Sequence, residues 1–213
     1  MFNPPLYERL FSRSQFVLAL TSPRRKQILL TNLGIPEEKI LVIGSNFEEN
    51  LQKTDVSASE YVSLTAKHKA QAVIDQLKTG RYVVMSSDTV VLCGDEILEK
   101  PSTPKVQLEW LKKYRQVGQL SVLTSVHFFL VSQGTVTNSV NDTEVTHLKF
   151  NESLDDAFLQ SYVSLGEALE AAGGFKYQEK GSLLFKGMEG DYFNVVGLPV
   201  AKTLKLMDDL VPV

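Results

Sequence analysis

The stretch Phe16-Val17-Leu18-Ala19-Leu20, followed at once by Thr21-Ser22-Pro23-Arg24-Arg25-Lys26, shows how the fold begins. Its first part is a short apolar run, which is typical of a buried strand. Ser22 is a favoured N-cap residue, and a proline such as Pro23 is favoured in the first helical turn. Apolar residues then recur at helical spacing until Gly34, a residue type that commonly ends a helix. The sequence therefore predicts a buried strand that leads directly into a helix.

The alternation of strands and helices continues along the chain. We expect further strands at residues 40–43, 82–85, 90–92, 97–98, 121–131 and 135–150, and helices at residues 57–78, 104–114, 154–165 and after Pro199. Residues 86–89 are expected to interrupt a strand, residues 93–96 to form a hairpin turn, and Gln133-Gly134 to join two long strands. Because hairpins are frequent, the predicted fold is α/β with a mixed, twisted sheet. No repeat or linker divides the chain, so residues 1–213 are expected to form a single domain.

Length and composition exclude several classes of protein. The chain has 213 residues, of which 22 are Lys or Arg and 25 are Asp or Glu, so its formal charge is −3. No apolar run approaches the roughly 20 residues that span a bilayer, and the N-terminal residues lack the apolar core of a signal peptide. A single cysteine, Cys93, excludes an internal disulfide, and three histidines argue against a structural zinc site. We therefore expect a cytoplasmic, globular protein that binds neither membranes nor nucleic acid.

The segment Ser22-Pro23-Arg24-Arg25-Lys26 places three cations in the first turn of the expected helix. The helix dipole disfavours exposed cations at this end by about 0.3–1 kcal/mol each, whereas the unpaired backbone N–H groups there attract anions. A bound phosphate would explain the pattern. Two alternatives remain open: the cations are solvated on a surface helix, or the segment contacts DNA or directs localisation. The acidic balance of the chain disfavours the second alternative.

Lys69 and Asp88 are charged residues in apolar surroundings. Lys69 falls on the apolar stripe of the helix expected at residues 57–78, so it is either a rim residue whose ammonium reaches water or a cation that holds phosphate in a cleft. Asp88 stands between two β-like apolar runs, and a buried carboxylate is costly unless it is paired, hydrogen-bonded or bound to a metal. It is either a cap of a bulge or turn, or a general base or metal ligand at a strand end.

Three further residues are candidates for a site. Lys100 is either a surface lysine or a second cation that points into the same region as Asp88. Glu49 is a second candidate carboxylate, although a solvated side chain is the simpler interpretation when it is taken alone. Gln178 lies in a glycine-rich segment, and its amide either reads the edge of a nucleobase or occupies an ordinary turn. The sequence contains no Walker A motif, no G-x-S-x-G and no H-E-x-x-H.

These motifs, in their order, resemble the Maf family of nucleoside triphosphate pyrophosphatases. The matching blocks are Ser22-Pro23-Arg24-Arg25, Ala66-x-x-Lys69-Ala70, Asp88-Thr89-Val90-Val91, Leu98-x-Lys100-Pro101, Gly166-Glu167, Ala172-Gly173-Gly174-Phe175-x-x-Gln178 and Asn194-Val195-Val196-Gly197-Leu198-Pro199. They lie between residues 16 and 205 and so cover nearly the whole chain. A lone S-P-R-R would be weak evidence, whereas the ordered set is highly specific.

The resemblance implies a two-lobed α/β fold similar to that of inosine triphosphate pyrophosphatases, with the nucleotide in a cleft between the lobes. It also implies hydrolysis of a nucleoside triphosphate to the monophosphate and pyrophosphate, with a divalent cation such as Mg²⁺, Mn²⁺ or Co²⁺. Asp88-Thr89, together with Gln178, resembles the branch that acts on dTTP and UTP, and modified pyrimidine nucleotides are further expected substrates of such a house-cleaning enzyme. The alternative function is a nucleotide-binding regulator of cell division with vestigial catalysis. The resemblance leaves a homodimer open.

The family's functional positions can be carried over residue by residue. Asp88 matches the proton acceptor, and Glu49 and Asp88 match the acidic residues of the metal region. The phosphate-binding positions correspond to Ser22, Arg24, Arg25, Lys69 and Lys100, and the positions associated with substrate choice to Arg24, Thr89 and Gln178. Because such cations would converge in an empty site, removal of Arg24 or Lys69 is expected to leave the unliganded protein equally or more stable.

The chain departs from the family pattern at two places. Leu20 stands where bacterial members commonly have serine, which removes one hydroxyl contact to phosphate. Residues 115–120 replace the usual L-S-G-x-x-H stretch, so no histidine from there is assigned a role. The expected catalytic core therefore matches the family more closely than its periphery does.

Overall fold

A computed structural model describes residues 4–47 and 51–211. The chain forms two compact units. The first unit comprises Met1–Asp88, Thr124–Thr143 and Gly197–Val213, and the second comprises Thr89–Leu123 and Glu144–Val196. The long strands β3 (Arg81–Cys93), β5 (Gln119–Ser132) and β6 (Thr135–Phe150) each contribute residues to both units.

The strands form a mixed sheet, which confirms the predicted α/β class. The remaining strands are β1 (Gln15–Leu18), β2 (Ile40–Val42), β4 (Glu96–Leu98) and β7 (Phe185–Glu189). Within the described residues the order is β2-β1-β3-β5-β6-β7, and β4 pairs with β3. Strand β1 is parallel to both β2 and β3, whereas the β3–β4 and β6–β7 pairs are antiparallel.

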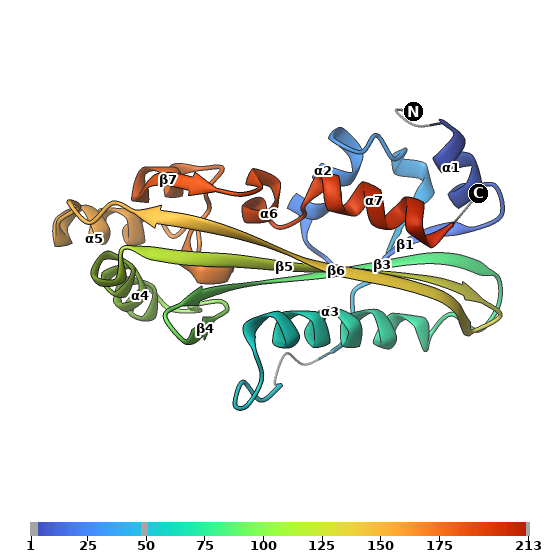
Figure 1. The fold of residues 1–213 in the computed structure, drawn as a ribbon, viewed down its shortest axis with the longest axis horizontal. Helices are drawn as coiled ribbons and strands as arrows, with labels where there is room; N and C mark the ends of the chain where they lie inside the picture. The colour runs from blue at the N-terminus through green and yellow to red at the C-terminus, as the bar shows by residue number, and fades with distance from the viewer. Residues whose placement is uncertain (1–3, 48–50, 212–213) are drawn as a thin grey trace. The chain divides into compact units, whose positions relative to one another are not determined.

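The helices flank these strands, as Figure 1 shows for each unit. The first unit contains α1 (Pro4–Phe11), α2 (Pro23–Thr31), α3 (Ala58–Ile74) and α7 (Val200–Leu210), with a short 3₁₀ turn at Glu37–Lys39. The second unit contains α4 (Pro104–Val117), α5 (Asp156–Ser164) and α6 (Tyr192–Val196), with 3₁₀ turns at Ala172–Gly174 and Lys180–Leu184. No helix of the described residues is long and apolar enough to cross a bilayer.

Local sequence explains where the principal elements begin and turn. Helix α3 begins after Ser57, because the Ser57 hydroxyl accepts from the Glu60 amide while the Glu60 carboxylate accepts from the Ser57 amide. The β5–β6 hairpin turns at Gln133 and Gly134, whose φ angles are 50° and 74°. Two successive positive φ angles are typical of a type I′ turn, which matches the twist of paired strands. The predicted hairpin at Gln133-Gly134 is therefore confirmed.

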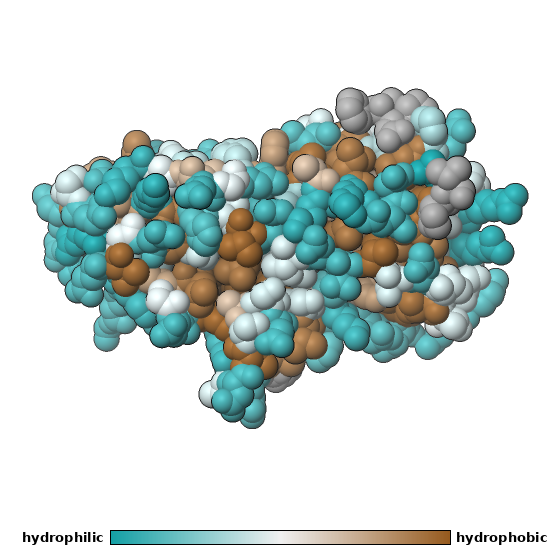
Figure 2. Space-filling model, viewed as in Figure 1, coloured by the Kyte–Doolittle hydropathy of each residue, from teal (hydrophilic) through white to brown (hydrophobic). Residues whose placement is uncertain are grey.

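Each unit has its own apolar core. In the first unit the sheet packs against α3 through Val17, Ala19, Ala70, Val73, Ile74, Leu77, Val84, Phe129 and Val131. In the second unit α4 and α5 pack against the strands and the glycine-rich segment, with Val91, Leu111, Tyr114, Phe150, Leu159 and Phe175 in the cluster. On the face that Figure 2 shows, hydrophilic residues predominate and apolar ones are exposed between them.

The expected break in the strand at residues 86–89 is wrong. Strand β3 runs without interruption from Arg81 to Cys93, and Asp88 lies inside it rather than in a turn or at a strand end. The strand continues because its polar side chains find partners on α3: the Ser86 hydroxyl donates to the Ala66 carbonyl at 2.7 Å, and Asp88 pairs with Lys69. Once these groups are satisfied, the backbone has no need to leave the sheet.

Three other expectations at this level need correction. Cys93 does not lie in the turn but ends β3, where it pairs with Glu96 across the β3–β4 hairpin and is buried in the second core. This burial raises the pKa of its thiol, as is typical of an unreactive core cysteine. Helix α1 and strand β7 were not expected, because α1 has few residues and β7 lies in the glycine-rich segment, where the local pattern is weak.

Candidate functional site

In the first unit, two predicted segments come together at the carboxyl end of β1, beside the middle of β3. The strands are parallel, Leu18 at the end of β1 is level with Met85 of β3, and the Ala19 amide donates to the Met85 carbonyl at 2.8 Å. Ser22 caps α2 just beyond β1, and Asp88 follows Met85 along β3. In open α/β sheets ligands bind outside the carboxyl ends of the strands, so this end is the expected place for a site.

Lys69 and Asp88 form a buried ion pair inside the length of β3, three residues beyond the level at which β1 ends. The Lys69 Nζ lies 2.7 Å from the Asp88 Oδ1, and the two residues are 8% and 6% exposed. Burial of either charge alone would be strongly unfavourable, whereas a close opposite charge and a hydrogen bond offset much of that penalty. Lys69 is therefore not a rim residue whose ammonium reaches water, and the helical spacing that placed it on the inner face of α3 is confirmed.

The start of α2 is built as the sequence predicts. Ser22 is the N-cap, with its hydroxyl 3.4 Å from the Arg25 amide, and Pro23 occupies the first helical position. The Arg25 Nε donates to the Gly197 carbonyl at 2.8 Å, which ties α2 to the segment that precedes α7. Lys26 pairs with Glu37 at the surface. Arg24 and Arg25 are partly buried, so they are not fully solvated surface charges.

The second unit carries the remaining described candidates. Thr89 lies in β3 and is partly buried, while Lys100 is exposed in the segment after β4. The Glu99 carbonyl next to Lys100 accepts from the Gly173 amide at 2.7 Å. Gln178 lies in a turn, and its Oε1 is buried with no hydrogen-bond partner within the described part of the chain. Burying an amide oxygen without a hydrogen bond is costly. The Gln178 Oε1 is therefore suited to accept a hydrogen bond from a ligand.

The acidic residues bear on whether a metal fits. Glu49 lies outside the described residues, so its predicted role stays a prediction. Within residues 4–47 and 51–211, no group of three or more His, Cys, Asp or Glu side chains could hold a metal ion. Mg²⁺ is commonly bound through one or two carboxylates together with substrate phosphates. A single carboxylate at Asp88 fits such an ion, one that the substrate brings with it, better than it fits a site made by the protein alone.

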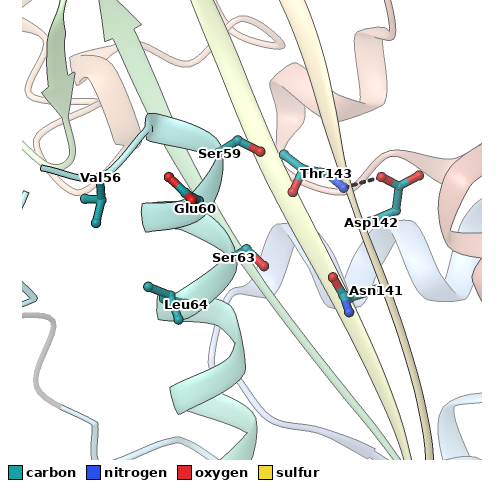
Figure 3. Close-up of a pocket in the computed structure, with 8 residues that line it drawn as sticks. All are labelled: Val56, Ser59, Glu60, Ser63, Leu64, Asn141, Asp142 and Thr143. Carbon is teal, nitrogen blue, oxygen red and sulfur yellow. Dashed lines mark hydrogen bonds between the residues drawn. The ribbon is translucent and has the colours of Figure 1, made fainter.

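A pocket in the first unit lies apart from these candidates (Figure 3). It has a volume of about 540 Å³ and is lined by Val56, Ser59, Glu60, Ser63, Leu64, Asn141, Asp142 and Thr143. None of the predicted site residues that the structure describes lines it. The Ser63 hydroxyl, on its α3 wall, lies 3.1 Å from Nε2 of the buried His127.

His127 is expected to make stability depend on pH. Burial first, and then the charge of Lys67, lower the pKa of His127 to about 4, below the value near 6.5 of an unfolded histidine. As the pH falls from about 6.5 to about 4, the unfolded chain binds a proton that the folded His127 rejects, so the free energy of unfolding decreases by up to about 3 kcal/mol. Denaturant titrations at several pH values would measure this slope.

The control for this prediction is the exposed His68. His127→Gln should flatten the loss of stability between pH 6.5 and pH 4, because the group that gains the proton on unfolding is gone. His68→Gln should keep the slope of the wild-type protein. Equal slopes in the two variants would contradict the assignment to His127.

Some residues of interest were missed because their partners are distant in sequence. Ser86 alternates with Asp88 along β3, so both lie on the face that meets α3, and the period of two was the available signal. Gln107 and Tyr114 fall on the buried stripe of α4 with Leu111, a helical spacing that the sequence also contains. The hydrogen-bond partners of the Gln107 amide and the Tyr114 hydroxyl could not be inferred from that spacing.

Comparisons with known proteins identify the family of this chain. The sequence profile of the family described as Maf-like protein matches residues 15–210. The dTTP/UTP pyrophosphatase of Schizosaccharomyces pombe is 36% identical over 227 residues, covering 97% of this chain and 92% of that protein. The dTTP/UTP pyrophosphatase of Saccharomyces cerevisiae is 36% identical over 209 residues, covering 91% of this chain and 89% of that protein.

Among solved structures, a HAM1 protein from Coxiella burnetii is 12% identical and covers 92% of this chain and 99% of that chain, with a TM-score of 0.47. Since the profile and both yeast relatives extend over most of its length, the chain belongs to the Maf-like protein family.

Proposed function

We propose that this chain hydrolyses dTTP and UTP to the nucleoside monophosphate and pyrophosphate. Two relatives that are 36% identical carry the name dTTP/UTP pyrophosphatase. The observation that carries the proposal is the buried Asp88 carboxylate, held 2.7 Å from the Lys69 ammonium just past the level at which β1 ends and leads into α2. Hydrolysis of a polyanion needs a base for the attacking water and fixed positive charge for the phosphates, and this pair supplies both.

In the proposed reaction, Asp88 accepts a proton from a water molecule whose oxygen attacks the α-phosphorus. A P–O bond forms there, the bond from the α-phosphorus to the oxygen bridging it to the β-phosphorus breaks, and that oxygen leaves with the electron pair as part of pyrophosphate. Lys69 has three N–H donors, one of which Asp88 accepts, and it directs positive charge at the phosphates. The Lys69 ammonium group thereby orients both the substrate phosphates and the general base, Asp88.

The start of α2 is proposed to bind the phosphates. Its backbone N–H groups and the Arg24 guanidinium suit an anion at a helix N-terminus. Ser22 caps the helix, and Arg25 adds charge while its Nε holds the Gly197 carbonyl. Lys100 keeps its predicted role as a phosphate-binding residue.

A divalent cation, when bound, would polarise the phosphate oxygens and offset negative charge on the leaving pyrophosphate. Among the described residues, Asp88 is the carboxylate proposed to hold it, with phosphate oxygens as the other ligands. Glu49 is proposed as a second acidic ligand. Mg²⁺, Mn²⁺ and Co²⁺ all accept such oxygen ligands.

Release of pyrophosphate from a panel of nucleoside triphosphates tests the function. We expect dTTP and UTP to give pyrophosphate rather than orthophosphate and to be preferred over purine triphosphates. Binding of dTTP without hydrolysis would instead support the nucleotide-binding regulator. If 7-methyl-GTP or ITP outcompetes both pyrimidine nucleotides, the assigned substrate branch is wrong, although the reaction type would stand.

Gln178→Ala tests the proposed contact to the base. Because the buried Gln178 Oε1 suits a donor on a pyrimidine edge, its loss should lower kcat/KM for dTTP and UTP by about 5- to 50-fold and affect purines less. Gln76→Ala, in an exposed position after α3, is the matched control and should leave the ratio unchanged. An unaltered preference in Gln178→Ala would remove Gln178 from the site. Thr89 would then be the next candidate for base selection.

A further inference from the structure

We propose that Gln107 and Tyr114 of α4 are positioning residues, which hold the Gly173-Gly174 turn and the adjoining Lys100 segment so that the enzyme prefers pyrimidine nucleotides. This inference rests on the function proposed above and concerns contacts within the second unit alone. Neither residue is proposed to touch the nucleotide. Both act through the glycine turn.

Tyr114 connects α4 to Gly173. Its side chain is fully buried, and its hydroxyl donates to the Gly173 carbonyl at 2.9 Å. The Gly173 amide in turn donates to the Glu99 carbonyl at 2.7 Å, and Lys100 is the next residue. One peptide segment is thus fixed on one side to α4 and on the other to the chain that carries Lys100.

Gln107 holds the next glycine in the same way. It is 1% exposed, and its Nε2 donates to the Gly174 carbonyl at 2.8 Å. A Cβ on Gly174 would lie 3.1 Å from the Gln107 Cγ and 3.3 Å from the Pro101 Cγ, so Gly174 packs closely between these two residues. The glycine turn is therefore close to both Glu99 and Pro101, the two residues that flank Lys100.

The conformation and packing of this turn require glycine at both positions. Gly173 and Gly174 have φ angles of 72° and 71°, which side chains rarely allow, and a Cβ on Gly173 would lie 2.4 Å from the Val91 Cγ2. A turn made of two glycines is flexible by itself. Its carbonyls therefore need external partners if the segment leading to Gln178 is to keep one conformation.

The Gln107 amide orients the Gly174 carbonyl and leaves its own oxygen unsatisfied. Its Oε1 is buried and has no hydrogen-bond partner within the part of the chain that the structure describes. A buried unsatisfied oxygen destabilises a fold, and an apolar residue at this position would avoid that cost but would also lose the donor to the Gly174 carbonyl. The amide is explained by its N–H donor to Gly174.

Tyr114 keeps its donor at any practical pH, because burial raises the pKa of its phenol well above the ordinary value. Its ring also packs edge-on against Phe175, the residue after the two glycines, with the ring centroids 6.3 Å apart. The Lys176 amide then donates to the Tyr162 hydroxyl at 3.2 Å. These contacts fix the chain from Gly173 to Lys176, which lies two residues before Gln178.

Tyr114→Phe and Gln107→Met remove the two donors while keeping most of the side-chain volume. With dTTP and a purine triphosphate competing in one assay, we expect each variant to lower the ratio of kcat/KM values by about 3- to 10-fold, with a rise in KM for dTTP. That ratio does not depend on how much of the enzyme is folded. A purely structural role would lower the melting temperature and leave the ratio as in the wild type.

Tyr7→Phe is the matched control. Tyr7 is also fully buried, and its hydroxyl also donates to a backbone carbonyl, that of Leu33, but it lies in the first unit. It should lose some stability and keep the wild-type substrate ratio. An unchanged ratio in both Tyr114→Phe and Gln107→Met would overturn the inference.

A second measurement keeps the inference separate from the proposed function. Hydrogen exchange of the Gly173 and Gly174 amides should quicken by about 3- to 10-fold in Tyr114→Phe and not in Tyr7→Phe. If the wild-type enzyme released no pyrophosphate from pyrimidine nucleotides, the proposed function would fail, and quicker exchange would still support the positioning of the turn. Unchanged exchange in an active enzyme would overturn the positioning and leave the function intact.

Discussion

Asp88→Asn is expected to lower kcat for dTTP hydrolysis by about 10²- to 10⁴-fold, the range for loss of a general base. The substitution keeps the size and most of the shape of the side chain but removes the carboxylate that would accept the proton of water. Nucleotide binding should survive, because the phosphate contacts at the start of α2 do not depend on Asp88. Single-turnover kinetics together with calorimetric binding of dTTP would separate the two effects.

Asp95→Asn, in the exposed turn between β3 and β4, provides the control for the same change of charge. It should retain wild-type turnover. If Asp88→Asn keeps more than about a tenth of the wild-type rate, a loss smaller than general-base removal produces, then Asp88 is not the base. Glu49 would become the next candidate.

Lys69→Met is expected to reduce the free energy of unfolding by about 3–5 kcal/mol, because it leaves the Asp88 carboxylate buried without its ammonium partner. This outcome reverses the expectation drawn from the sequence, in which cations converging on an empty phosphate site predicted equal or greater stability. The ion pair changes the sign, since Lys69 neutralises a buried negative charge before any nucleotide binds. Urea unfolding at pH 7 without ligand is the measurement.

The double variant Lys69→Met/Asp88→Asn isolates the pair. Removal of both charges should restore a large part of the stability that Lys69→Met loses, because buried ion pairs are often replaced by uncharged groups at little cost. Lys67→Met, at an exposed position of the same helix, should change stability by no more than about 0.5 kcal/mol. A stability loss in the double variant as large as that in Lys69→Met would show that the two charges do not compensate one another.

Much of the fold was predictable from local sequence. Ser22 and Pro23 specify the start of α2, the capping residues Ser57 and Glu60 specify the start of α3, and Gln133-Gly134 specifies the β5–β6 turn. Each of these signals acts between residues that are close in sequence, and a short segment therefore contains its own explanation.

The course of β3 could not be predicted in the same way. Polar residues in the middle of a strand usually indicate a break, and only α3 shows why β3 continues: its Ala66 carbonyl and its Lys69 ammonium satisfy Ser86 and Asp88. These partners are far from the strand residues in sequence. A break was therefore the reasonable local prediction and the wrong one.

For the candidate site, the sequence by itself determined which residue types are present, in which order, and that Lys69 faces inward from its helix, because helical periodicity is a local property. Only the tertiary structure decided that Lys69 neutralises Asp88, that Arg25 holds the Gly197 carbonyl, and that Gln107 and Tyr114 hold the glycine turn. A buried charge or amide must find a partner, but its own sequence neighbourhood does not specify which distant group the folded chain brings within hydrogen-bonding distance.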